Sequence, residues 1–174
     1  RRNRFLVTSL REGIVGAVSD DGTYKVFIQD SNLVSAIGIR VDAERDRLLV
    51  CNSDPGVSVH TRKENQGKLA GLGVFQLSTG KLIKYLDLGK LGGAGGHFCN
   101  DIALDAAGNA YVTDSFSPII YKVDAGNNAS VLLAASAPAA SSTVANPRHA
   151  PASRRAGTLR RTFTTRPSRA TNSR

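Results

Sequence analysis

The sequence contains no methionine or tryptophan, only two cysteines, and no apolar run long enough to cross a membrane as a helix. A spanning helix needs roughly 18 or more consecutive apolar residues, and no such stretch occurs here. Two cysteines are too few for a disulfide-framed small domain, and their separation does not match that of metal ligands. These absences exclude a transmembrane helix, a disulfide scaffold and a cysteine-held zinc site.

The N-terminus has no charged-then-apolar leader with a small-residue cleavage site. The chain opens on Arg1 and has no initiator methionine, which is typical of an internal part of a longer reading frame or of a processed product. The compartment therefore stays open from the sequence. We expect a soluble protein with no membrane partner, exported if a leader has been removed.

Cys51 and Cys99 have two interpretations. As small hydrophobes in strands they match the buried, inert role that is common for free cysteine, and this is the interpretation that we favour from the sequence. In an exported protein they would instead form a single disulfide.

Acidic residues are missing after Asp124. All 14 lie at or before that position, whereas 8 arginines and no lysine follow it. The portion up to Asp124 therefore holds 15 of the 23 basic residues, for a net charge of +1, and the tail supplies the remaining +8. A basic surface for nucleic acid would belong to the tail and not to the folded part.

Short runs of Val, Ile, Leu, Thr and Tyr, separated by Gly, Asp and Asn, are present instead, and they are typical of an all-β protein. Three of these runs superimpose, centred on Val7, Val50 and Val112, at spacings of 43 and 62 residues. A spacing of about 40 to 50 residues is that of one four-stranded propeller blade. The longer second spacing contains a polar stretch, 53–73, which we interpret as a surface loop, and a Gly-rich connection, 89–96, which we interpret as flexible.

Further strand-like runs surround each valine run and are separated by turn signals. They lie at 13–18 and 24–28, at 73–77 and 82–88, and at 119–123 and 129–133. A fourth run, at 38–42 and at 101–105, precedes the second and third copies, and the first copy lacks it. One such sheet cannot bury both of its faces, so neighbouring units must stack. A β-sandwich or a meander barrel is the alternative, but neither explains the repetition of four-strand units.

Residues 134–174 differ in composition, because Ala, Ser, Thr, Pro and Arg dominate and apolar residues are sparse. Such a segment cannot bury enough surface to offset its ordering entropy, so we predict a disordered C-terminal tail. One interpretation is a basic tail that binds nucleic acid non-specifically or meets an acidic surface. The other, which we favour, is a frameshifted reading of a GC-rich gene.

The most specific pattern lies in the stretch 97–114. There Asn100-Asp101 is followed by an apolar residue and then by Asp-x-x-Gly-Asn-x-Tyr-Val-Thr-Asp, which ends at Asp114. The pattern resembles a blade of the senescence marker protein/gluconolactonase/regucalcin family of six-bladed β-propellers and of their diisopropyl-fluorophosphatase-like relatives. The resemblance spans residues 5 to 133. It implies a partial β-propeller of about three four-stranded blades over 1–133, followed by the tail 134–174.

The resemblance implies that the protein binds a divalent metal, usually calcium in that family, which oxygen ligands from several blades hold in the central tunnel. It makes Asn100 a candidate metal or substrate contact and Asp101 a direct or indirect partner of the metal. The competing interpretation is that both residues only bond backbone groups at the start of a strand. The second copy has Ala36-Ile37-Gly38 in place of Asn-Asp, and the family's other ligands would come from blades that this chain lacks.

Two function classes follow. The first is a metal-dependent lactonase or ester hydrolase, in which the cation polarises the carbonyl and activates water; its catalytic residues stay unassigned, and we expect this chain alone to be an incomplete active site. The second is a non-catalytic propeller that binds ligands through its loops. Gly89–Gly96 lacks the ending of a phosphate loop, and His60, His97 and His149 are not spaced as metal ligands.

Overall fold

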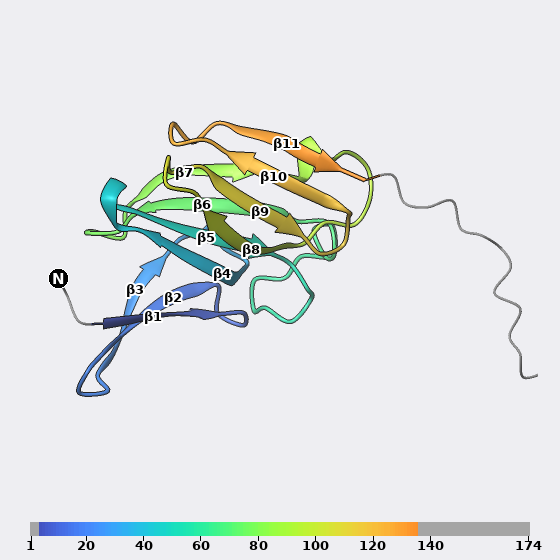
Figure 1. Cartoon of the computed structure of the whole chain (residues 1–174). Coiled ribbons are helices and arrows are strands. Elements are labelled where there is room, and N and C mark those ends of the chain that lie inside the picture. Colours follow the sequence, from blue (N-terminus) through green and yellow to red (C-terminus); the bar gives the residue numbers. More distant parts are fainter. Residues whose placement is uncertain (1–3, 136–174) are drawn as a thin grey trace, which may run out of the picture. The chain divides into compact units, whose positions relative to one another are not determined.

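The computed structural model describes residues 4–135, which form eleven β-strands and two short helical turns (Figure 1). The strands are β1 (Arg4–Ser9), β2 (Ile14–Ser19), β3 (Tyr24–Gln29), β4 (Ser35–Asp42), β5 (Arg47–Ser53), β6 (Ala70–Gln76), β7 (Leu82–Asp87), β8 (Cys99–Leu104), β9 (Ala110–Asp114), β10 (Ile119–Val123) and β11 (Ala129–Ala134), and the helical turns are η1 (Ala43–Arg45) and α1 (Gly89–Gly92). No helix in this part of the chain is long and apolar enough to span a membrane. The all-β prediction is confirmed, whereas the predicted disorder of the tail concerns residues outside the described range.

The strands form three antiparallel sheets in which sequence neighbours pair (Figure 1). The first sheet is β1-β2-β3, the second is β4-β5-β6-β7, and the third is β8-β9-β10-β11. Every run that the sequence predicted as a strand is a strand, and the first sheet lacks a fourth strand as expected. The runs form strands because β-branched and aromatic residues alternate between turns. The sheets lie against one another through their first strands, since β4 contacts both β1 and β8.

The hydrophobic core consists of two layers, one on each side of the second sheet. Alternate residues of β5 point to opposite faces, so Leu48 and Val50 pack toward the first sheet, whereas Leu49 and Cys51 pack toward the third. All seven residues of β5 are buried. The continuous apolar run 48–51 is explained by this position, because a strand that is covered on both faces needs no polar side.

A disulfide joins Cys51 on β5 to Cys99 on β8, with their Cα atoms 5.3 Å apart. Both cysteines are buried in strands, as predicted, but the favoured interpretation of two free thiols is wrong. The pairing depends on how the second and third sheets stack, because 48 residues separate the two cysteines along the chain. Disulfides persist in oxidising compartments, in agreement with an exported protein.

Arg47, at the start of β5, ties the second sheet to two turns of the third. Its buried guanidinium donates to Asp42 at 2.6 Å, to the Gly108 carbonyl at 2.7 Å and to the Asn127 side-chain oxygen at 2.9 Å. Burial opposes the ionised form of Asp42, but the hydrogen bond and charge of Arg47 outweigh it and hold the pKa of Asp42 below its ordinary value. The sequence does not indicate this clamp, because its members are 61 and 80 residues apart.

The two long connections are more ordered than their composition indicates. Gly89–Gly92 form the helical turn α1, and Gly92 lies so close to the Tyr121 hydroxyl and to His97 that a side chain there would overlap them. Residues 54–69 connect β5 to β6; one hydrogen bond joins the two ends of this loop, and another holds its middle to the turn between β1 and β2. The Gly67 N–H donates to the Asp54 carbonyl at 2.8 Å, and the Val59 N–H donates to the Arg11 carbonyl at 2.9 Å.

Candidate functional site

Asn100 and Asp101 lie side by side on β8, the first strand of the third sheet, and both are exposed. The Asp101 carboxylate accepts a hydrogen bond from the N–H of the next residue, Ile102, at 2.8 Å. The backbone N–H of Asp101 donates to Thr113 Oγ1 at 3.3 Å. Asp101 therefore performs the local backbone role that was the competing interpretation of this pair. The side chain of Asn100 makes no hydrogen bond to the described residues.

Gly38 on β4 faces the backbone of Asn100 across the contact between the second and third sheets. A Cβ atom at Gly38 would overlap the Asn100 carbonyl oxygen. The second copy therefore carries glycine here because β4 and β8 approach closely. This packing requirement accounts for the glycine of the Ala36-Ile37-Gly38 segment.

A calcium site is not completed by the residues that the structure describes. Within 4–135, no group of three or more His, Cys, Asp or Glu side chains gathers in a geometry that holds a metal. Calcium takes about six to eight oxygen ligands, whereas Asn100 and Asp101 offer only their own side-chain oxygens, of which one Asp101 oxygen already accepts the Ile102 N–H. These two side chains alone supply too few oxygen ligands for calcium, so a site here would need ligands from other groups.

His97, which the sequence analysis set aside because the histidines are not spaced as metal ligands, forms a buried pair with Asp114. His97 Nδ1 lies 2.7 Å from Asp114 Oδ2, and the Tyr121 hydroxyl donates to the same oxygen at 3.1 Å. Burial opposes ionisation of Asp114, but the hydrogen bond from His97 leads the contacts that lower its pKa. The other carboxylate oxygen accepts the backbone N–H groups of Phe98 at 2.8 Å and Phe116 at 3.0 Å. Both oxygen atoms of the Asp114 carboxylate are thus used in hydrogen bonds to neighbouring backbone and side-chain groups.

Asn52, at the end of β5, performs the same task in the second sheet. Its side-chain oxygen accepts the N–H groups of Val34 at 2.7 Å and Ser35 at 3.1 Å, as Asp114 accepts that of Phe98. Its amide donates to the Tyr85 hydroxyl at 2.7 Å. Asn52 and Asp114 occupy equivalent positions of the repeat, and each fixes the segment that enters the first strand of its sheet. The buried side chains of Asn52 and Asp114 therefore hold backbone segments of the fold in place.

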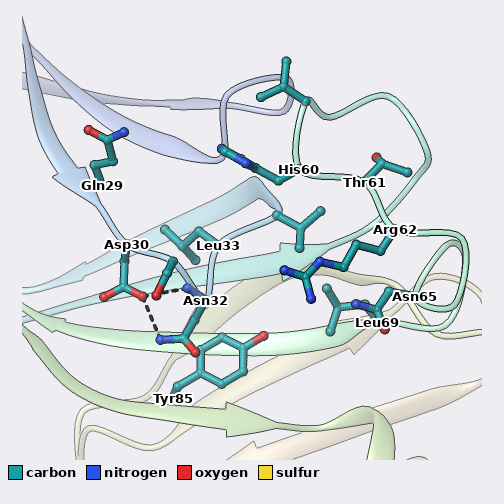
Figure 2. A pocket seen from close by; sticks show the side chains of 13 residues that line it. Gln29, Asp30, Asn32, Leu33, His60, Thr61, Arg62, Asn65, Leu69 and Tyr85 are labelled. Carbon is teal, nitrogen blue, oxygen red and sulfur yellow. Dashed lines mark hydrogen bonds between the residues drawn. The ribbon is translucent and has the colours of Figure 1, made fainter.

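A polar groove of about 800 Å³ lies between the loop that joins β3 to β4 and the loop that joins β5 to β6 (Figure 2). Tyr85 on β7 forms its floor. Burial is the main reason that the pKa of Tyr85 lies above its ordinary value. The groove is lined by Gln29, Asp30, Ser31, Asn32, Leu33, Val34, Val59, His60, Thr61, Arg62, Asn65, Leu69 and Tyr85.

No family model matches the chain, and no curated protein matches it. The resemblance carried by the stretch 97–114 therefore gains no support from these comparisons and stays a prediction.

Arg62 lines the groove, and Figure 2 shows its guanidinium directed inward from the loop. It forms no ion pair with the described residues, whose ion pairs involve other side chains. The loop that carries Arg62 is held in place by Asp54, which is buried. Asp54 accepts the Arg62 N–H at 3.0 Å and the Thr61 hydroxyl at 2.8 Å. The cation is thus presented on a loop that is organised in advance.

The opposite side of the groove is acidic and amide-rich. The Asp30 carboxylate accepts hydrogen bonds from the backbone N–H of Asn32 at 2.9 Å and from the side-chain amide of Asn32 at 2.7 Å (Figure 2).

Sequence reasoning missed the groove, since 53–73 was interpreted as a surface loop and His60 was set aside. The available signal was the length of that polar stretch, which accounts for much of the longer repeat spacing.

Proposed function

We propose that the three sheets are consecutive blades of a β-propeller and that the chain is a non-catalytic binding module. Three features support the blade assignment: each sheet runs in chain order, the first strands β4 and β8 lie against one another, and the matched valine runs occupy equivalent positions. The groove between the first two sheets is the binding site in this proposal.

The observation that carries the proposal is Arg62, which forms no ion pair with the described residues and lies in a groove with a polar lining. A guanidinium presents a rigid fork of donors that matches a carboxylate or phosphate. Asp30 and Asn32, across the groove, accept and donate hydrogen bonds and match hydroxyl groups. The ligand that fits this arrangement is a small hydroxylated organic anion.

The test is calorimetric titration of the full chain with gluconate, with sorbitol as a neutral probe of similar size. We expect gluconate to bind and sorbitol to bind at least tenfold more weakly. Arg62→Gln should lose roughly 10- to 100-fold in affinity, because a hydrogen bond to a charged group contributes about 1.5 to 3 kcal/mol.

Lys63→Gln is the matched control, since it removes the same charge from the neighbouring residue, which does not line the groove. Its affinity should equal that of the wild type. Equal binding of gluconate and sorbitol, or an equal loss in the Arg62 and Lys63 variants, would show that the groove does not recognise an anion.

The metal-dependent lactonase or ester hydrolase is a second candidate function. The observation that favours it is the exposed side chain of Asn100, which makes no hydrogen bond to the described residues at the start of β8. In this function a lactone or ester would be the substrate, and further calcium ligands would have to come from outside residues 4–135. Micromolar calcium binding together with lactone hydrolysis, both lost in Asn100→Ala, would support it against the binding module.

A further inference from the structure

Asn128-Ala129-Ser130 is an acceptor triplet for N-linked glycosylation, in which serine or threonine follows an asparagine by two residues. None of the other asparagines in the sequence begins such a triplet. The pattern is short and also occurs by chance, so its place in the fold decides whether it is usable. Two conditions have to be met: the asparagine must reach solvent, and the protein must enter an oxidising secretory compartment.

The first condition is met, because Asn128 lies exposed in the tight turn that joins β10 to β11. The Asp124 N–H donates to the Asn128 carbonyl at 3.0 Å and closes this turn. Ser130, the third residue of the triplet, is exposed as well, and its hydroxyl makes only a long hydrogen bond of 3.5 Å to the Lys122 carbonyl. Both side chains that a glycosyltransferase has to recognise are therefore at the surface.

The exposure of this turn does not depend on what packs beside the third sheet. An equivalent hydrogen bond, from the Gln76 N–H to the Lys81 carbonyl at 2.7 Å, closes the turn between β6 and β7 in the second sheet. The second sheet is covered on both of its faces, and Lys81 is nevertheless exposed. Stacking covers the faces of a sheet and leaves these turns at its end open, so a neighbour on the third sheet would leave Asn128 at the surface.

The side chain of Asp124 holds Asn128 in a defined conformation. Its carboxylate accepts hydrogen bonds from the Asn128 backbone N–H at 2.8 Å and from the Asn128 side-chain amide at 3.1 Å. The backbone hydrogen bond leads the contacts that place the pKa of Asp124 below its ordinary value. A glycosylated asparagine keeps one N–H on its side-chain nitrogen, so the modification is compatible with a hydrogen bond to Asp124.

The disulfide between Cys51 and Cys99 addresses the second condition, and it does so independently of the triplet. Disulfides form and persist in oxidising compartments, among them the lumen of the endoplasmic reticulum. Acceptor triplets are used in proteins that pass through the same secretory route. The bond and the exposed triplet therefore indicate one and the same cellular environment.

We propose that Asn128 is an N-glycosylation site, with a lipid-linked oligosaccharide diphosphate as the donor. A bond forms between Asn128 Nδ2 and C1 of the first sugar, and the bond between C1 and the diphosphate oxygen breaks. One amide proton is released, and the lipid diphosphate is the leaving group. The product carries a bulky, hydrophilic oligosaccharide on the turn between β10 and β11.

The glycan and the anion-binding groove lie at opposite ends of β5. Arg47, at the start of β5, donates to the Ala125 carbonyl of the glycosylated turn at 3.3 Å. Asn52, near the end of β5, accepts the N–H of Val34, which lines the groove. The seven residues of β5 span roughly 20 Å, so the glycan leaves the groove open. The gluconate titration and the glycosylation test therefore succeed or fail separately.

Expression of the full chain in a cultured eukaryotic cell, behind a cleavable secretion leader, tests the proposal. We expect one oligosaccharide on the chain, seen as a mass above 18.4 kDa that peptide-N-glycosidase reduces to the mass of the bare chain. That enzyme converts the modified asparagine to aspartate, which peptide mass spectrometry should locate at position 128. Intracellular and secreted chains are both analysed, so that a poorly secreted variant still gives a result.

Asn128→Gln and Ser130→Ala should each abolish the added mass, whereas Ser130→Thr should retain it. Ser130→Ala leaves Asn128 and its hydrogen bonds in place, so it separates loss of the triplet from disturbance of the turn. Asn109→Gln is the matched control, because Asn109 makes the same two hydrogen bonds to Asp105 in the turn between β8 and β9 but begins no triplet. A wild-type chain without oligosaccharide, or an oligosaccharide that persists in Asn128→Gln or Ser130→Ala, would overturn the proposal.

Discussion

Replacing Arg47 by methionine should lower the free energy of unfolding by about 3 to 5 kcal/mol, the usual cost of breaking a buried ion pair from one side. The side chains of Arg47 and Asp42 are each only 5% exposed. The substitution keeps the apolar stem but leaves Asp42 charged and buried, and it leaves the Gly108 carbonyl without its donor. Arg45, whose guanidinium lies 3.3 Å from the Asp42 carboxylate, still neutralises part of the charge of Asp42 in this variant. We therefore expect a loss of unfolding free energy at the lower end of that range.

Urea unfolding with the disulfide intact measures the effect, as a shift of the midpoint at constant slope. Arg11→Met is the control, since Arg11 pairs with Glu12 at the exposed surface and such pairs contribute about 0 to 1 kcal/mol. Adding Asp42→Asn to the Arg47 variant should recover part of the loss, because the orphaned charge is then removed. A loss below about 1 kcal/mol, or no recovery in the double variant, would refute the clamp.

The pH dependence of this prediction has a defined sign. The folded-state pKa of Asp42 lies below its ordinary value because Arg47 outweighs burial. Its stabilising contribution is therefore present above the unfolded pKa of about 3.9 and is lost as the pH falls through the folded value. The difference in stability between the wild type and Arg47→Met should narrow below about pH 4.

Two further predictions concern the contact between the second and third sheets. Reducing the Cys51–Cys99 disulfide, which spans 48 residues, should lower the free energy of unfolding by about 4 kcal/mol in the chain-entropy model, measured as the change in urea midpoint with and without reductant; an unchanged midpoint would contradict it. Gly38→Ala should destabilise the chain by about 1 to 3 kcal/mol, because the new methyl group overlaps the Asn100 carbonyl, whereas Gly22→Ala, in open space, should show only the smaller strain of its positive φ. Equal midpoints for these two variants would show that β4 and β8 do not approach closely.

Much of the candidate site was beyond sequence reasoning. Arg62 and Asp30 lie in different loops, and only the packing of the first sheet on the second brings them to one groove. Asn100 and Asp101 were identified from a local pattern, and the structure places them together because they are neighbours in the chain. Whether further ligands join them is a tertiary question, and within residues 4–135 no group of three or more His, Cys, Asp or Glu side chains gathers to hold a metal.

The sequence by itself determined the strands, their turns and their grouping into repeats, because these depend on contacts between residues a few positions apart. The alternation of side chains and the Asp, Asn and Gly turns act within one hairpin, so the runs around Val7, Val50 and Val112 were readable without a structure. The Cys51–Cys99 bond, the Arg47 clamp and the groove were decided only by the tertiary structure. Each depends on how whole sheets stack, and the chain separation of the groups involved leaves no periodic signal that local physical chemistry could detect.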